Sequence, residues 1–268
     1  MTFIALRYNA PSALRALIPG HLAKPLQKAG QLPVTRLWIL VILPLALSFS
    51  MPLPADQFGS RPAPWVGTTL DGRECANFPR ATQGFTGGGL DYRRFSSSEA
   101  PLSTVEKRHF TNQVESLQGG ENNTSPIKDI NYTLRAFPNH HRALYTLIRH
   151  FTRDSGGGNN TGSQRSSIIP PECYLKRAGK FVPNDPNVPL LHALYLHRLG
   201  HLDKADSMYR QAIDIAPSSP EAHYNHGLLL FKQKKFDAAQ AAARKAYELG
   251  YPLPGLRKKL KAKGYAIE

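Results

Sequence analysis

Cysteine is scarce in this chain of 268 residues, which contains only Cys75 and Cys173. Neither residue lies in a Cys-x-x-Cys motif or in a Cys/His spacing typical of zinc sites, so the sequence predicts no metal site of that kind. In an exported chain two distant cysteines are a candidate disulfide, whereas in a cytosolic chain they are ordinary thiols. Both alternatives are open at this point.

The chain also lacks a long uninterrupted apolar run. Its most apolar stretch, Leu37–Met51, follows Arg36 and is broken by Pro44, and it is short for a transmembrane helix, which needs about 20 residues. A basic flank followed by a short apolar core is typical of a secretory signal peptide. We therefore expect residues 1–55 to be a signal peptide or an N-terminal membrane anchor, with a mitochondrial transit peptide as the alternative.

This interpretation predicts a location in the periplasm or outside the cell, with contact to the inner membrane only through the N-terminal segment. Acidic residues are few: the chain has 34 Lys and Arg against 19 Asp and Glu, a net charge of +15, and its first acidic residue is Asp56. Such a balance suits acidic partners, anionic lipid or nucleic acid, but we interpret it as a solvated surface. The one polybasic cluster is the tail at Arg257–Lys263. We expect no nucleic-acid partner, and keep binding of nucleic acid or an anionic surface through this tail as an alternative.

Common catalytic motifs are missing as well, because the sequence has no HExxH, GxSxG, Walker loop or dinucleotide fingerprint. The ten histidines form small clusters without a carboxylate pattern, and we interpret them as solvated or half-buried. The Gly87–Gly89 triplet has no strand before it and no helix after it, which favours a surface loop. The sequence thus predicts no cofactor, no metal and no enzyme activity. The alternative is an enzyme or accessory subunit with a site in the irregular region Asp56–Ser103.

A repeat with a period of 34 residues is present in the C-terminal half of the chain. Small residues recur at the same places of two successive segments: Ala193 and Gly227, Ala205 and Ala239, and Ala212 and Ala246. Small side chains let two antiparallel helices approach closely, and the large apolar residues between them predict a core. This pattern resembles the tetratricopeptide repeat, a helix–turn–helix unit.

The resemblance implies an all-α fold, a short right-handed solenoid of about two and a half repeats with an irregular N-terminal third. A capping helix at Pro254–Lys263, ended by Gly264, should cover the apolar face of the last repeat. A degenerate first repeat is expected at Arg142–Pro183, with a loop at Asp154–Ser167 inserted in its turn. The other helices predicted from apolar spacing are Val105–Leu117, Ile127–Phe137, Arg142–Phe151 and Pro171–Val182.

The predicted organisation has three parts: the leader at residues 1–55, an irregular Gly/Pro/Ser-rich segment at 56–103, and the helical domain at 104–268. A narrower resemblance covers residues 91–268. The stretch Asp129–Leu144 in particular is similar to a group of exported bacterial tetratricopeptide-repeat proteins of unassigned activity. That resemblance implies a fold and a compartment, not a reaction.

In the tetratricopeptide family, the first helix of each unit lines a concave groove that binds peptides. Carried onto this chain, the family positions imply a groove made of Arg142, Tyr145, Arg149, Leu190, Leu194, His197, Arg198, Tyr224, Leu228, Phe231 and Lys232. This mixture of apolar, aromatic and basic residues suits an extended or helical peptide that carries carboxylates, with Tyr224 and Phe231 as anchors. We therefore expect a non-enzymatic protein–protein interaction module, a scaffold or adaptor, outside the cytoplasm.

Overall fold

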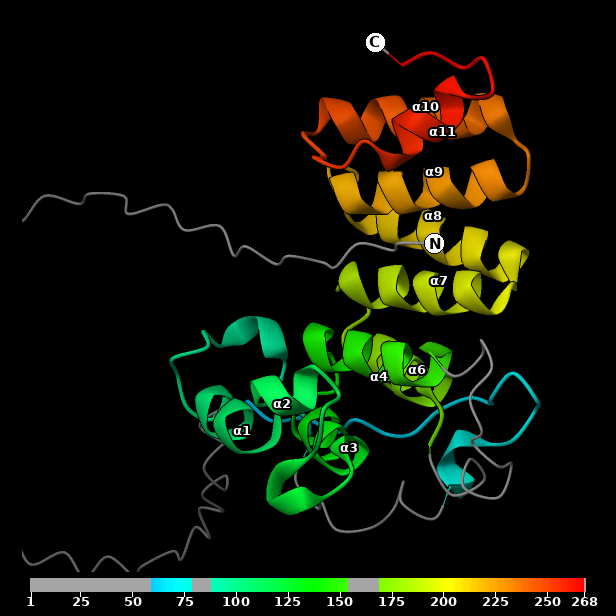
Figure 1. The fold of residues 1–268 in the computed structure, drawn as a ribbon. Coiled ribbons are helices and arrows are strands. Elements are labelled where there is room, and N and C mark those ends of the chain that lie inside the picture. The colour runs from blue at the N-terminus through cyan, green and yellow to red at the C-terminus, as the bar shows by residue number, and fades with distance from the viewer. Residues whose placement is uncertain (1–58, 79–87, 154–168, 268) are drawn as a thin grey trace, which may run out of the picture. The chain divides into compact units, whose positions relative to one another are not determined.

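The computed structural model describes residues 59–78, 88–153 and 169–267 (Figure 1). The chain divides into two units, residues 1–51 and 52–268, and every described residue belongs to the second.

Two predicted segments, the leader at residues 1–55 and the inserted loop at 154–167, lie outside the described residues. In the described part the fold is all-α, as expected, and β structure is limited there to two isolated bridges. No described helix is both long and apolar enough to cross a membrane.

Three short 3-10 helices accompany the α-helices: η1 (Cys75–Asn77), η2 (Tyr92–Arg94) and η3 (Glu121–Asn123). The α-helices are α1 (Leu102–His109), α2 (Asn112–Glu115), α3 (Pro126–Ala136), α4 (His141–Arg153), α6 (Pro171–Phe181), α7 (Asn187–Leu199), α8 (Leu202–Ile215), α9 (Pro220–Lys232), α10 (Phe236–Glu248) and α11 (Gly255–Lys261).

The predicted repeats are the helix pairs α7/α8 and α9/α10, and α8 also contacts α9. Small residues lie buried where the helices meet: Ala193, Ala205 and Ala239 are each 0% exposed. Gly227 is buried as well, and a Cβ atom added there would lie 2.5 Å from Cδ2 of Leu256 in α11. The missing side chain at this repeat position thus lets the C-terminal helix pack closely on α9.

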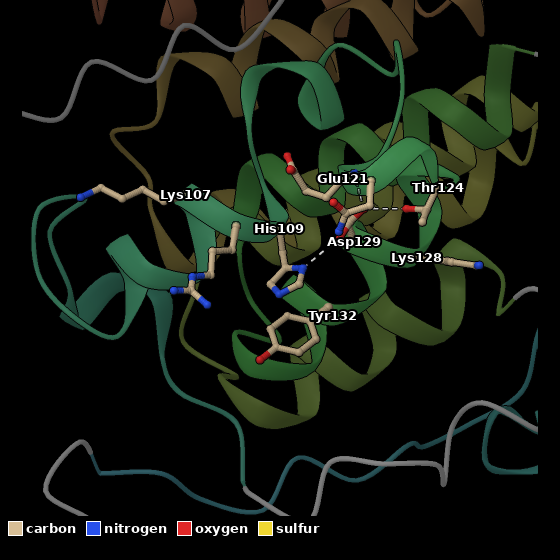
Figure 2. A pocket seen from close by; sticks show the side chains of 9 residues that line it. Lys107, His109, Glu121, Thr124, Lys128, Asp129 and Tyr132 are labelled. Atoms are coloured by element: carbon tan, nitrogen blue, oxygen red, sulfur yellow. Dashed lines mark hydrogen bonds and ion pairs between the residues drawn. The ribbon is translucent and has the colours of Figure 1, made fainter.

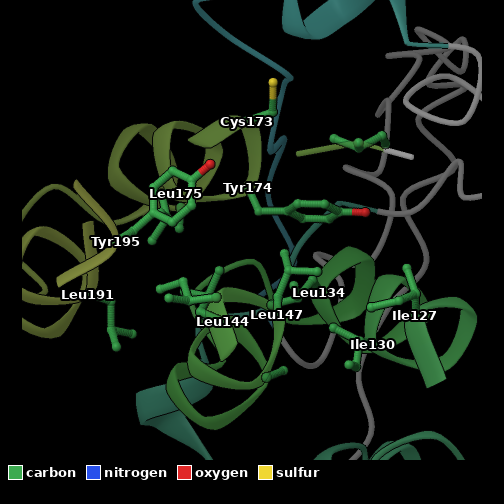
Figure 3. Packing of buried hydrophobic residues seen from close by; sticks show 14 of the residues in the cluster. Ile127, Ile130, Leu134, Leu144, Leu147, Cys173, Tyr174, Leu175, Leu191 and Tyr195 are labelled. Carbon is green, nitrogen blue, oxygen red and sulfur yellow. The ribbon is translucent and has the colours of Figure 1, made fainter. Parts of the chain in front are cut away.

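Helices α4 and α6 form a third pair, at the place of the predicted degenerate repeat, and both contact α7. Figure 3 shows the core that these helices share with α3. Ile130 and Leu134 of α3, Leu144 and Leu147 of α4, and Leu175 of α6 are each at most 1% exposed. Burial of such a side chain stabilises a fold by about 1.5–3 kcal/mol, so this cluster is a major source of stability.

The capping helix is present as α11, which contacts both α9 and α10. Leu256 and Leu260 are 0% exposed. These two leucines cover the apolar face of the last repeat, which confirms the predicted role of this helix.

The prediction of one helix over Val105–Leu117 is wrong, because the chain forms α1 and the short α2 with a break between them. Phe110 leaves helical geometry, with φ −138° and ψ 46°, and Thr111 is extended. The Phe110 ring is 3% exposed and packs edge-on against His140, with ring centroids 4.8 Å apart. The turn thus brings Phe110 into the core, a long-range contact that apolar spacing along the chain does not reveal.

The irregular N-terminal segment is joined to α6 by a disulfide between Cys75 and Cys173, whose Cα atoms are 5.4 Å apart. Both cysteines are 0% exposed. Next to them Trp65 packs edge-on against Tyr174, with ring centroids 4.9 Å apart. The described part of this segment therefore lies against the helices.

A buried polar network makes a second attachment. Asn139, which is 0% exposed, donates hydrogen bonds to Asp91 (2.8 Å) and Asp185 (2.9 Å), and accepts one from the backbone N–H of Tyr92 (2.9 Å). Burial raises the pKa of Asp91, but hydrogen bonds from Arg93 and Asn139 outweigh it and lower this pKa to about 2. The ionised carboxylate thus connects the irregular segment to the turn that precedes α4.

Candidate functional site

The first helices of the three pairs, α4, α7 and α9, carry all the residues that the family pattern places in a groove. Helix α7 contacts both α4 and α9. We call the surface made by these three helices the A-helix face. Each predicted residue was placed on it by its position within the 34-residue period, and the tertiary contacts decide which of them are accessible.

Four of the predicted groove residues are core residues instead: Leu190, Leu194, His197 and Tyr224 are 5%, 8%, 3% and 6% exposed. Leu190 belongs to the apolar cluster between α7 and α8. Tyr224, an expected anchor, stacks on Tyr251 with ring centroids 4.1 Å apart. The repeat position of these side chains predicted an accessible groove. This prediction is wrong for the four residues, because neighbouring helices and the C-terminal segment cover them.

Arg142, the groove residue predicted at the start of α4, is already bound to other side chains. Arg142 lies over the Phe110 ring and forms ion pairs with Glu106 (3.3 Å) and Glu115. The hydrogen bond to Glu115 raises the pKa of Arg142 above its ordinary value. This guanidinium therefore connects α4 to α1 and α2, and it adds little to a surface that would attract an acidic partner.

Tyr145, Arg149 and Arg198 form a half-buried cluster across α4 and α7. The guanidinium carbons of Arg149 and Arg198 lie 6.0 and 5.5 Å from the Tyr145 ring centroid. Arg198 also donates to the hydroxyl of Thr152 (3.2 Å). Such cation–π contacts hold both arginine side chains in place on the Tyr145 ring.

Helix α9 contributes Leu228, Phe231 and Lys232, of which the first two are half-buried and Lys232 is exposed. The Nζ atom of Lys259 in α11 lies 5.9 Å from the Phe231 ring centroid. We call these four residues the Phe231 patch. The repeat period does not predict a role for Lys259, because only the packing of α11 on α9 brings this lysine beside Phe231.

His197 is buried and lies close enough to Arg198 of α7 and Lys232 of α9 for their charges to act on it. Its pKa is lowered to about 4, first by burial and then by the positive charges of Lys232 and Arg198. The imidazole is therefore neutral at neutral pH. Positive charge from α7 and from α9 thus acts on the same part of the A-helix face.

The histidine clusters are part of the fold. His140 is buried, accepts a hydrogen bond from the backbone N–H of Ala143 (3.2 Å) and contacts Glu106 (3.0 Å), while His141 contacts Asp185 (2.7 Å). Among the described residues there is no group of three or more metal-ligating side chains that could hold a metal ion. The hydrogen bond from Ala143 shows that His140 caps the start of α4, and the contacts with Glu106 and Asp185 hold both histidines within the fold.

Comparison with known proteins identifies the repeats. A family model described as "TPR repeat" matches residues 194–234, and one described as "Tetratricopeptide repeat" matches residues 220–249. The chain is also similar to the protein O-mannosyl-transferase TMTC3 of Homo sapiens and of Mus musculus, at 39% identity over 83 residues in each case. The similar region is 31% of this chain and 9% of the length of those relatives. The chain is therefore a protein that contains tetratricopeptide repeats.

Proposed function

We propose that this protein is a non-enzymatic interaction module whose A-helix face binds a peptide that carries carboxylates. Tetratricopeptide repeats are in general suited to binding peptides and proteins. The observation that carries the finer proposal is the Phe231 patch: an incompletely buried Phe231 beside Lys232 and Lys259, which have no ion-pair partner among the described residues. An apolar contact flanked by uncompensated positive charge favours a peptide that has apolar and acidic side chains.

Selection from a random-peptide display library tests the proposal without knowledge of the natural partner. Peptides enriched by the wild-type protein should contain Asp or Glu next to large apolar residues. Replacing an aromatic anchor by alanine typically costs about 2 kcal/mol, so Phe231→Ala should weaken binding about thirtyfold. Lys232→Glu should weaken it too, because it reverses a charge near the bound carboxylates.

Lys204→Glu is the matched control, since Lys204 is an exposed lysine on α8 outside the A-helix face. This variant should bind the selected peptides as the wild type does. Phe231 also packs edge-on against Phe236 (5.4 Å), so far-UV circular dichroism must show that Phe231→Ala is folded. If the folded Lys232→Glu variant binds every selected peptide with unchanged affinity, the Phe231 patch is not the site.

We further propose that the protein acts outside the cytoplasm, as an exported or membrane-anchored scaffold or adaptor. The basic leader with its apolar run at Leu37–Met51 supports this location. The disulfide between Cys75 and Cys173 supports it as well, because disulfides persist in oxidising compartments and are rare in the cytosol. N-terminal sequencing of cell fractions can test the location.

A further inference from the structure

A pocket of about 580 Å³ lies away from the A-helix face, between the end of α1, the η3 turn and the first half of α3 (Figure 2). Its lining is rich in chemically active side chains, including His109, Asp129, Tyr132 and three basic residues. No motif in the sequence predicts this cluster. The residues come from elements that are separated along the chain, so only the tertiary structure brings them together.

The centre of the pocket is a histidine held by a buried carboxylate. The Nδ1 atom of His109 lies 2.9 Å from Oδ1 of Asp129, which is 6% exposed. The second oxygen of Asp129 accepts hydrogen bonds from the backbone N–H of Glu121 (3.0 Å) and the hydroxyl of Thr124 (3.3 Å). Asp129 is itself fixed by these two donors, so its contact with Nδ1 holds the imidazole ring in one orientation.

The other ring nitrogen of His109, Nε2, has no hydrogen-bond partner among the described residues. The His109 side chain is 30% exposed. A second contact, with Tyr132, keeps the ring in place: the two ring centroids are 3.8 Å apart and the planes are inclined by 30°. Nε2 is thus a fixed polar atom available to a ligand.

Tyr132 is unusual because it is a large aromatic residue that stays 42% exposed. It lies one helical turn after Asp129 on α3, so both residues share one side of the helix. While His109 stacks on the ring, the exposed remainder of Tyr132 is an apolar surface beside Nε2. This arrangement suits a ligand with a polar group next to a planar one.

The basic residues give the pocket a positive charge. Lys107, Arg108 and Lys128 are exposed, and none of them has an ion-pair partner among the described residues. In Figure 2, Lys107 and Lys128 extend on opposite sides of the His109–Tyr132 pair. The two carboxylates of the lining are engaged by other donors, because Glu121 accepts from the hydroxyl of Thr111 (2.9 Å) and Asp129 is bound as described.

We propose that this pocket binds a small phosphomonoester. A phosphate group carries about −1.5 to −2 charges at pH 7 and three acceptor oxygens, which suits a pocket lined by His109 and three basic residues. Because its second proton leaves near pH 6, such a group can hydrogen bond to Nε2 as donor or as acceptor. A pocket of about 580 Å³ is much larger than a bare phosphate, so the organic part of the ligand lies against Tyr132.

Calorimetric titration of the full chain with phenyl phosphate, inorganic phosphate and phenol tests this proposal. Phenyl phosphate should bind at one site and more tightly than inorganic phosphate, and phenol should not bind measurably. Tyr132→Ala should remove most of the preference for phenyl phosphate over inorganic phosphate. Added salt should weaken the binding of both anions, because salt screens the attraction between exposed charges.

A matched pair of histidine variants isolates Nε2. In His109→Asn the amide nitrogen takes the place of Nδ1 and can keep the bond to Asp129, but nothing replaces Nε2. In His109→Gln the longer side chain places its amide near the position of Nε2. Loss of one hydrogen bond to a charged group should weaken the binding of phenyl phosphate about tenfold in His109→Asn. In His109→Gln part of this affinity should return.

Lys128→Ala should also weaken binding, whereas Lys204→Ala, outside the pocket, should not. Circular dichroism shows whether each variant is folded. If a histidine variant does not fold, Lys128→Ala and Arg108→Ala carry the test, since both side chains are exposed. The proposal is overturned if phenyl phosphate shows no saturable binding up to about 10 mM, where a millimolar site would be filled, or if Lys128→Ala and Arg108→Ala both bind it as the wild type does.

Discussion

At the scale of single residues, the turns that end four helices follow one pattern. A residue with a positive φ lies one to three positions after the helix in each case, at Gly200 (85°), Lys234 (63°), Gly250 (85°) and Gly264 (84°). The next N–H then bonds to the carbonyl five residues earlier, as from His201 to Leu196. This is the Schellman motif, in which glycine is preferred because other residues meet steric strain at positive φ.

Lys234 is the exception, and it lies 34 residues after Gly200, at the same repeat position. We predict that Lys234→Gly stabilises the protein by about 1 kcal/mol, because glycine removes the strain of the left-handed conformation. Arg244→Gly, in the interior of α10, should instead destabilise it by about 1 kcal/mol, the usual cost of glycine within a helix. Urea unfolding of both variants measures these changes, and a loss of stability in Lys234→Gly would contradict the prediction.

At the scale of structural elements, the irregular segment depends on its attachments to the helices. Before α1 begins at Leu102, its described part forms only short 3-10 helices and isolated bridges, so its own backbone hydrogen bonds contribute little. Buried contacts replace them: Trp65 packs on Tyr174, and Arg177 donates hydrogen bonds to the carbonyl oxygens of Ala63 (2.7 Å) and Leu134 (2.6 Å). The segment is therefore ordered by the surface on which it lies.

The disulfide should make the largest single contribution to this attachment. Cys75 and Cys173 are 98 residues apart, and closing a loop of about that length stabilises a fold by roughly 4–5 kcal/mol in the chain-entropy model. We predict that the variant Cys75→Ser/Cys173→Ser loses stability of this order in urea unfolding. The reduced wild type serves as the control and should unfold with the variant. If the oxidised wild type and the double variant unfold at the same urea concentration, the bridge does not stabilise the protein.

At the scale of the whole molecule, the proposed export makes a prediction about the N-terminus. The apolar run at Leu37–Met51 resembles the core of a signal peptide and is followed by small residues. We predict that the mature chain begins between Met51 and Asp56, or that an uncleaved chain is anchored with its helical domain on the same side. Sequencing of the N-terminus from each cell fraction decides this, and a soluble cytosolic protein that retains Leu37 would exclude export.

Local sequence determined the existence of the helix pairs and the positions at which they touch. Ala205 and Ala239 are 34 residues apart and both 0% exposed. Small residues recur with this period because the two helices of each repeat pack closely at the same position. The capping helix was predictable from local sequence as well. Its leucines recur at helical spacing, and an end repeat needs a cover.

The tertiary structure alone decided which side chains of the A-helix face are accessible. Tyr224 and Phe231 occupy the same helix, yet Tyr224 is covered by Tyr251 while Phe231 is not fully buried. The tertiary structure also forms the pocket at His109, since the contact between His109 and Asp129 joins α1 to α3 across the break at Phe110. Period and spacing describe how one helix faces its own partner, whereas burial and side-chain contacts depend on segments that are distant along the chain and close only after folding.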